Sequence, residues 1–236
     1  IMAYGTGKQL SIKDALKGIE IAPTTKPKRF EWGVVEYQTP NNETRWRYHN
    51  TDIVTLTKTG DIILNSGGFR TMTTKEKTNN ILTHIGQRLS YRRWFIHQAN
   101  GLWTVSNRQD GLHVPYFDGL NLSKANDLET QIEAQKAQLE QIKLRKAILE
   151  YSKLYTLESA LPDGKATEGD CWLCCGIAHN EREHLLAHIK EGYVMTHLAC
   201  RALEANGYSP TEYMFQVRMD AVQRSVAKYL YKALGV

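Results

Sequence analysis

The feature that most constrains the fold is a run of 38 residues, 123–160, that contains no glycine and no proline. Almost all of its residues are strong helix formers, which predicts one nearly continuous helix. At about 1.5 Å per residue this helix would reach roughly 55 Å, which is longer than a small globular domain. We therefore divide the chain into three sections, residues 1–120, 121–162 and 163–236.

Apolar residues in this run approximate a heptad repeat, which we call the seam. Its apolar members are Leu128, Ile132, Leu139, Ile142 and Leu149, and its polar members are Gln135, Lys146 and Lys153. A dimeric coiled coil, and hence a homo-oligomer through residues 123–160, is one interpretation. Packing against the C-terminal helices is the second, and a single solvated helix between two domains is the third. We expect another helix, from this chain or a partner, to cover the seam.

The residue pattern of the first section predicts a small α+β domain. Capping boxes at Ser11 and Thr73 predict two helices, the second running to about Ile85 with Gly86 at its C-terminal cap. The pair Asn100-Gly101 predicts a tight hairpin. Runs rich in β-branched and aromatic residues predict the strands, at 30–38, 44–48, 51–57, 62–64, 91–97 and 102–106. These elements make an antiparallel β-meander with one or two helices.

The third section contains the most specific chemistry of the sequence. Cys171 and Cys174 can grip an ion from a tight turn, and His184 and His188, four residues apart, lie on one face of a predicted helix. This spacing predicts a Cys₂His₂ zinc site whose four protein ligands make it structural. The fold class is therefore α+β: the β-meander domain, a long connecting helix and a zinc-stabilised helical C-terminal module.

Other assignments of the same residues stay open. The two cysteines could form a redox pair, and the two histidines could be ordinary helix-surface residues. Four further residues lie near enough in sequence to replace a ligand, namely Cys175, His179, His197 and Cys200.

Positive charge is concentrated in the first section, which contains 16 Lys/Arg residues and 10 Asp/Glu residues. This excess favours DNA or RNA as a partner, bound mainly through phosphates. The candidate contacts are Lys28, Arg29, Arg47, Arg70, Arg92 and Arg93. Trp32, Trp46, Tyr91, Trp94 and Trp103 could stack on unpaired bases if their rings are exposed. The alternative is an ordinary solvated sheet with aromatic core residues.

Catalysis has less support in the sequence. His49 and Asp52, with scattered Glu36, Asp61, Asp110 and His113, could hold Mg²⁺ for a nuclease, but their spacing matches no nuclease signature. Phosphate-binding, dinucleotide-binding and serine-elbow motifs are missing from the sequence. Without a long apolar run or a leader, and with four clustered cysteines, we expect a reduced cytoplasmic protein.

Several short motifs resemble a domain of uncharacterised tailed-bacteriophage proteins. They are residues 48–54 (YHNTDIV), 64–71 (LNSGGFRT), 94–97 (WFIH), 101–105 (GLWTV) and 115–119 (PYFDG). Residues 169–174 (GDCWLC) and 184–188 (HLLAH) resemble the companions of that domain. The resemblance implies a viral protein that works in the host cytoplasm, and it implies no activity.

These observations predict a non-catalytic phage protein with a structural zinc site that binds nucleic acid or a protein on nucleic acid. The competing hypothesis is an oligomeric structural or adaptor protein that acts through its helices. A metal-dependent nuclease is the third.

Overall fold

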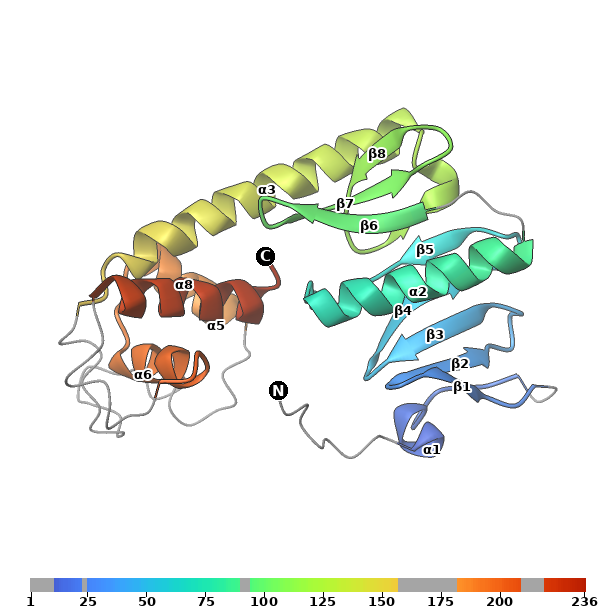
Figure 1. Cartoon of the computed structure of the whole chain (residues 1–236), viewed down its shortest axis with the longest axis horizontal. Coiled ribbons are helices and arrows are strands. Elements are labelled where there is room, and N and C mark those ends of the chain that lie inside the picture. Colours follow the sequence, from blue (N-terminus) through green and yellow to red (C-terminus); the bar gives the residue numbers. More distant parts are fainter. Residues whose placement is uncertain (1–10, 23–24, 90–93, 157–181, 209–218) are drawn as a thin grey trace. The chain divides into compact units, whose positions relative to one another are not determined.

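The computed structural model describes residues 11–22, 25–89, 94–156, 182–208 and 219–236. The chain divides into two compact units, residues 1–139 and 140–236, and each is described by itself. Helix α3 (Leu128–Ser152) begins in the first unit and ends in the second. Figure 1 shows the elements of both units.

The first unit contains a six-stranded antiparallel sheet. Its strands are β1 (Lys28–Glu31), β2 (Val34–Gln38), β3 (Thr44–Tyr48), β4 (Thr51–Leu56), β5 (Ile62–Leu64) and β9 (Leu120–Asn121). They are hydrogen-bonded in the order β1-β2-β3-β4-β5-β9, so five consecutive strands form a meander and β9 joins its last edge. The predicted strands at 44–48 and 62–64 have the predicted bounds, because a turn bounds each of them.

The prediction of one strand over residues 30–38 is wrong. A turn at Trp32 and Gly33 separates β1 from β2, and Gly33 has a φ of 77°. This conformation favours glycine, and an added Cβ at this position would lie 3.0 Å from the ring of Tyr48. Because residues on both sides of the turn are aromatic or β-branched, the sequence pattern indicated one continuous strand.

A second, three-stranded sheet follows in the chain, with β6 (Trp94–Ala99), β7 (Leu102–Asn107) and β8 (Leu112–Pro115) in sequential order. Asn100 and Gly101 have φ of 53° and 80°, which confirms the predicted two-residue hairpin. The sequence did not predict β8 or β9, since both are short and carry little β-branched character.

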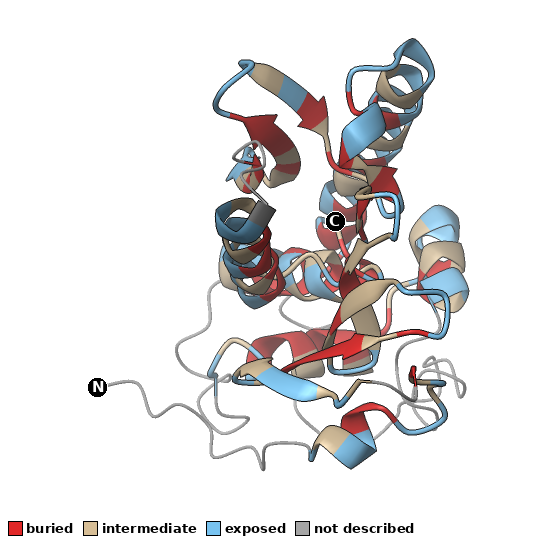
Figure 2. Cartoon of the chain, turned by 90° about the vertical axis from the view of Figure 1, so that its right-hand side faces the viewer, coloured by how far each residue is buried: buried red, intermediate tan, exposed pale blue. Residues whose placement is uncertain are grey.

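Helix α2 (Met72–Leu89) differs from its prediction at both ends. The hydroxyl of Thr71 accepts the backbone N–H of Thr74 at 3.2 Å, so the cap lies two residues before Thr73. The helix then continues through Gly86 to Leu89. A glycine inside a helix lowers its stability only modestly, so Gly86 does not end it. Buried residues of α2, including Ile81 and Ile85, share one core with Trp46, Leu64 and both sheets (Figure 2).

A smaller core lies where the short helix α1 (Ile12–Ala15) meets β2. Ser11 caps α1 through the backbone N–H of Asp14, as its capping box predicted. Beside this core, Tyr37 donates a hydrogen bond to Asp52 at 3.0 Å. Burial, followed by the negative charge of Asp52, raises the pKa of Tyr37 to about 12. Tyr37 and Asp52 are therefore engaged with each other inside the sheet.

Helix α3 is shorter than predicted. It starts after the 3₁₀ turn η1 (Leu122–Lys124) and ends at Ser152, so it spans about 38 Å at 1.5 Å per residue. The chain leaves the helix at Lys153, before any glycine or proline, because Tyr155 turns into the core of the second unit.

In its described part, the second unit packs the helices α5 (Arg182–Glu191), α6 (Thr196–Glu204) and α8 (Met219–Leu234) with the end of α3. Its core contains Ile148, Tyr155, Leu203 and Leu230, which are fully buried. Arg182 donates to the carbonyl of Leu234, and this bond links the start of α5 to the end of α8. The α+β class and the long helix with C-terminal helices are thus as predicted. None of the helices in the described parts of the chain is long and apolar enough to cross a membrane.

Candidate functional sites

The two predicted zinc-binding histidines lie side by side on α5. Nε2 of His184 is 3.0 Å from Nε2 of His188, and the two rings are nearly perpendicular at 78°. Nitrogen ligands of tetrahedral zinc lie about 2.0–2.1 Å from the ion, and therefore about 3.3 Å from each other. In this structure the 3.0 Å contact is a hydrogen bond between the two rings, and it is slightly shorter than the spacing of two ligands that share one ion.

The surroundings of His188 also suit a metal ligand. Its ring is buried and stacks on Tyr193 with the centroids 4.9 Å apart, and its Nδ1 is buried with no hydrogen-bond partner among the described residues. Burial, and then the charge of His184, lower the pKa of His188, which favours the neutral imidazole that binds metals.

The structure describes only two of the four residues of the predicted zinc quartet, His184 and His188. Cys171 and Cys174 lie outside the described residues, as do Cys175 and His179. His197 and Cys200, the remaining possible substitutes, lie on α6. In the described part of the chain, no three residues of types His, Cys, Asp or Glu form a group that could hold a metal. The zinc site stays a prediction, supported by the geometry of the histidine pair.

The predicted phosphate contacts have different surroundings. Arg47 donates to Asp52 at 2.9 Å and to the carbonyl of Ala15 at 3.0 Å, so internal contacts occupy its guanidinium. The guanidinium of Arg70 lies over the ring of Tyr116 at 5.2 Å. Lys28 and Arg29 are exposed on β1, although Lys28 also pairs with Glu36 at 3.0 Å. Arg92 and Arg93 lie outside the described residues.

Most of the tryptophans considered for base stacking are buried. Trp46, Trp94 and Trp103 belong to the core of the first unit, and the indole of Trp46 donates to Glu36 at 3.1 Å. These rings are therefore not available to unpaired bases. Trp32, in the β1–β2 turn, is 53% exposed. Tyr91 lies outside the described residues.

The residues considered for a nuclease have structural roles in the first unit. Asp52 accepts bonds from Tyr37, Arg45 and Arg47, and Glu36 is buried beside Trp46. His49 has a φ of 50° in the β3–β4 turn. The structure does not gather these side chains around an open position for a metal.

Asp118 joins two of the motifs that are far apart in sequence. Its carboxylate accepts the backbone N–H groups of Ser66 and Gly68 and the hydroxyl of Tyr116, the last at 2.8 Å. Gly67 has a φ of 60°, and an added Cβ there would lie 2.6 Å from the hydroxyl oxygen of Thr51. These contacts hold residues 66–71, which we call the braced loop, in one conformation.

The second sheet brings together three polar residues that the sequence did not associate. Ser106 Oγ lies 2.8 Å from Nε2 of His97 and 2.7 Å from Nδ1 of His113. Each of the three comes from a different strand, and Ser106 is directly opposite His113 in the register. Since β8 was not predicted, no sequence signal pointed to this cluster. Ser106 itself is buried, so its hydroxyl has no open approach for a substrate.

The apolar members of the seam are the largest set of exposed apolar side chains on one element in the described structure. Leu128, Ile132, Leu139, Ile142 and Leu149 are between 44% and 76% exposed. The opposite face of α3 is buried instead, through Ala134, Gln141, Ile148 and Tyr151. The described C-terminal helices share a core with Ile148 and Tyr151 of that face. They leave the seam exposed, which contradicts the interpretation in which they cover it.

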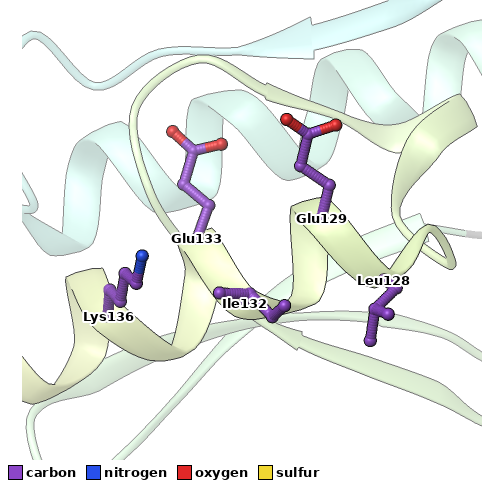
Figure 3. A pocket seen from close by; sticks show the side chains of 5 residues that line it. All are labelled: Leu128, Glu129, Ile132, Glu133 and Lys136. Carbon is purple, nitrogen blue, oxygen red and sulfur yellow. The ribbon is translucent and has the colours of Figure 1, made fainter.

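A hollow of about 530 Å³ lies at the N-terminal end of the seam (Figure 3). The residues that line it are Leu128, Glu129, Ile132, Glu133 and Lys136. The carboxylates of Glu129 and Glu133 point the same way, and the side chains of Leu128 and Ile132 point away from them. The hollow thus combines an apolar wall with two negative charges.

A comparison with protein families finds a match within the first unit. Residues 24–123 match the family model of the Kyanoviridae Gp96 protein. The match runs from before β1 to the end of β9, and it supports a phage protein family, as the resemblance implied. It does not reach α3 or the predicted zinc ligands. No curated protein and no solved structure matches the chain.

Proposed function

We propose that the chain is a non-catalytic phage protein with a structural or adaptor role that associates with a second copy through the seam of α3. The observation that carries this proposal is the division of α3 into two faces. One face packs into the two units, and the other displays five aliphatic side chains to solvent. Exposed apolar patches of this extent are typical of interaction sites.

The expected association is weak. Full burial of one aliphatic side chain stabilises by about 1.5–3 kcal/mol, so five half-exposed ones offer on the order of 5 kcal/mol per copy. A pair of copies then gains about 10 kcal/mol, against an association cost of about 4–15 kcal/mol. We therefore expect an equilibrium between monomer and dimer that depends on concentration.

In this proposal, the C-terminal module is held by zinc through Cys171, Cys174, His184 and His188. The spacing of the two histidine nitrogens supports that part. The phage family match supports a viral protein, and action in the host cytoplasm is part of the proposal.

A polar substitution in the seam tests the association. Leu139→Ser should abolish the dimer and leave the thermal stability nearly unchanged, because Leu139 is 56% exposed in the chain. The measurement is sedimentation velocity from about 1 to about 300 μM, the range in which a weak dimer forms. Met72→Ser, which changes an apolar side chain that is 72% exposed outside α3, is the matched control and should dimerise normally. A wild-type chain that is monomeric throughout would contradict the proposal.

Nucleic-acid binding is the second candidate function. The observation that favours it is a short stretch that presents Lys28, Arg29 and Trp32 to solvent. Since Arg47 and Arg70 have internal contacts, the described candidates offer fewer phosphate contacts than the sequence predicted. The nuclease hypothesis has the least support, because its carboxylates are engaged.

Salt dependence tests this second function. Binding of a labelled single-stranded oligonucleotide should weaken with salt, by a log-log slope of roughly −0.7 per phosphate contact. The double change Lys28→Ala with Arg29→Ala should reduce both affinity and slope in fluorescence anisotropy. Lys228→Ala, at an exposed lysine of the second unit, is the control. Affinity that does not respond to salt, or to the double change, would count against this function.

A further inference from the structure

We infer that the seam pairs with the seam of a second copy in the antiparallel direction, about a two-fold axis between Leu139 and Ile142. This inference rests on the proposed self-association and specifies its geometry. It starts from the order of polar and apolar residues along the exposed face of α3. Read outward from the midpoint, this order is nearly the same in both directions.

An antiparallel pair matches the seam residues by kind. Leu139 lies against Ile142 of the second copy, and Ile132 lies against Leu149 of the second copy. Gln135 then faces Lys146 of the second copy, so the polar positions meet each other and leave the apolar pairs uninterrupted. A surface that is complementary to itself in this way is the requirement for a two-fold interface.

A parallel pair would match the same residues less well. Each seam residue of α3 would then face its own counterpart, so that Lys146 would meet Lys146 of the second copy. Like charges at facing positions of a helix pair are destabilising. The antiparallel direction avoids this contact.

Charges beside the seam oppose each other in the antiparallel pair. Lys136 approaches Lys143 of the second copy, and exposed Glu140, one turn away on the neighbouring row, offsets this repulsion.

The second copy has only this face of α3 to bind. Gln141, Ile148 and Tyr151 on the opposite face are buried within the chain. Arg145 on the flank lies over the ring of Tyr231 at 4.2 Å. A partner helix must therefore use the seam and the row that carries Lys136 and Lys143.

A single charge at Gln135 separates the two directions, because it has opposite effects in them. In the antiparallel pair, Gln135→Glu faces Lys146 of the second copy twice, and the dimer dissociation constant should fall about 3- to 10-fold. In a parallel pair the same change opposes two carboxylates, and the constant should rise. The measurement is sedimentation velocity on the full chain, with Gln87→Glu on α2 as the matched control.

A charge exchange between positions 135 and 146 gives a second test of the direction. Gln135→Lys alone should weaken the antiparallel dimer, and adding Lys146→Glu should restore it, whereas a parallel dimer would not recover. Gln135 and Lys146 are exposed within the chain, and circular dichroism should show unchanged helix content. Weakening by Gln135→Glu, or failure of the exchange to restore association, overturns the antiparallel geometry while self-association stands. A monomer for the wild type and every variant overturns both.

Discussion

Replacing Cys174 by serine or His188 by alanine should remove zinc from the protein and unfold much of its C-terminal module. Leu185 and His188 of α5 are buried in the second unit, so a change at His188 acts directly on its core. Apparent binding free energies of structural zinc are about 10–16 kcal/mol in small zinc-binding peptides, so its loss should exceed the stability of the packed helices. We expect the largest effect of any single change in the chain.

Metal analysis and proteolysis together measure this effect. Freshly purified protein should contain one zinc per chain by mass spectrometry, and each of the two variants should contain much less. Limited proteolysis should then cut the variants within α5 and α6 while the first unit stays intact. Cys200→Ser is the control, because Cys200 lies on α6 outside the predicted quartet. Zinc-free wild-type protein, or full zinc content after Cys174→Ser, would rule the quartet out.

Local signals in the sequence predicted the parts of the fold that depend on neighbouring residues. The cap of α1 at Ser11 and the hairpin at Asn100-Gly101 each need only a few adjacent residues, and both are as predicted. The turn at Trp32-Gly33 is also local. It was not predicted, because the strand-forming residues on both sides outweighed the turn signal of a single glycine. Periodicity located α3 but not its end, because Tyr155 leaves the helix for a core made by distant residues.

Contacts between segments that are distant in the sequence could not be predicted from local patterns. Asp118 lies about fifty positions from Ser66, and nothing in either motif indicates that one binds the other. The cluster around Ser106 depends on the register of β7 with β8, and β8 was not predicted. For the zinc site, the helical spacing of His184 and His188 did predict their convergence, since four residues make about one turn.

The two faces of α3 show why a heptad alone does not identify what a helix packs against. The seam has the more apolar residues, yet the chain buries the face that carries Ala134 and Gln141. The small side chain of Ala134 permits a close approach, and Ile148 and Tyr151 anchor the C-terminal end of α3 in the second core. The apolar residues of the seam stay exposed on α3, and they form the surface that the proposed second copy would bind.

Asp118→Ala should lower the free energy of unfolding of the first unit by about 2–4 kcal/mol. The carboxylate is the acceptor for two backbone N–H groups and one hydroxyl. Ser66 and Tyr116 are each 2% exposed, so their donors find no water after the change, and each buried donor without an acceptor costs about 1–3 kcal/mol. Gly68 is nearer the surface, where solvent can replace the lost bond.

Chemical denaturation followed by tryptophan fluorescence measures this loss, because Trp46, Trp94 and Trp103 all lie in the core of the first unit. Tyr116→Phe is the graded comparison. It removes one donor and leaves the two backbone bonds to Asp118 in place, so it should cost only about 1 kcal/mol. Equal effects of the two changes would mean that the hydroxyl alone matters. A loss below about 0.5 kcal/mol for Asp118→Ala, the size typical of an ordinary surface substitution, would show that Asp118 does not brace the loop.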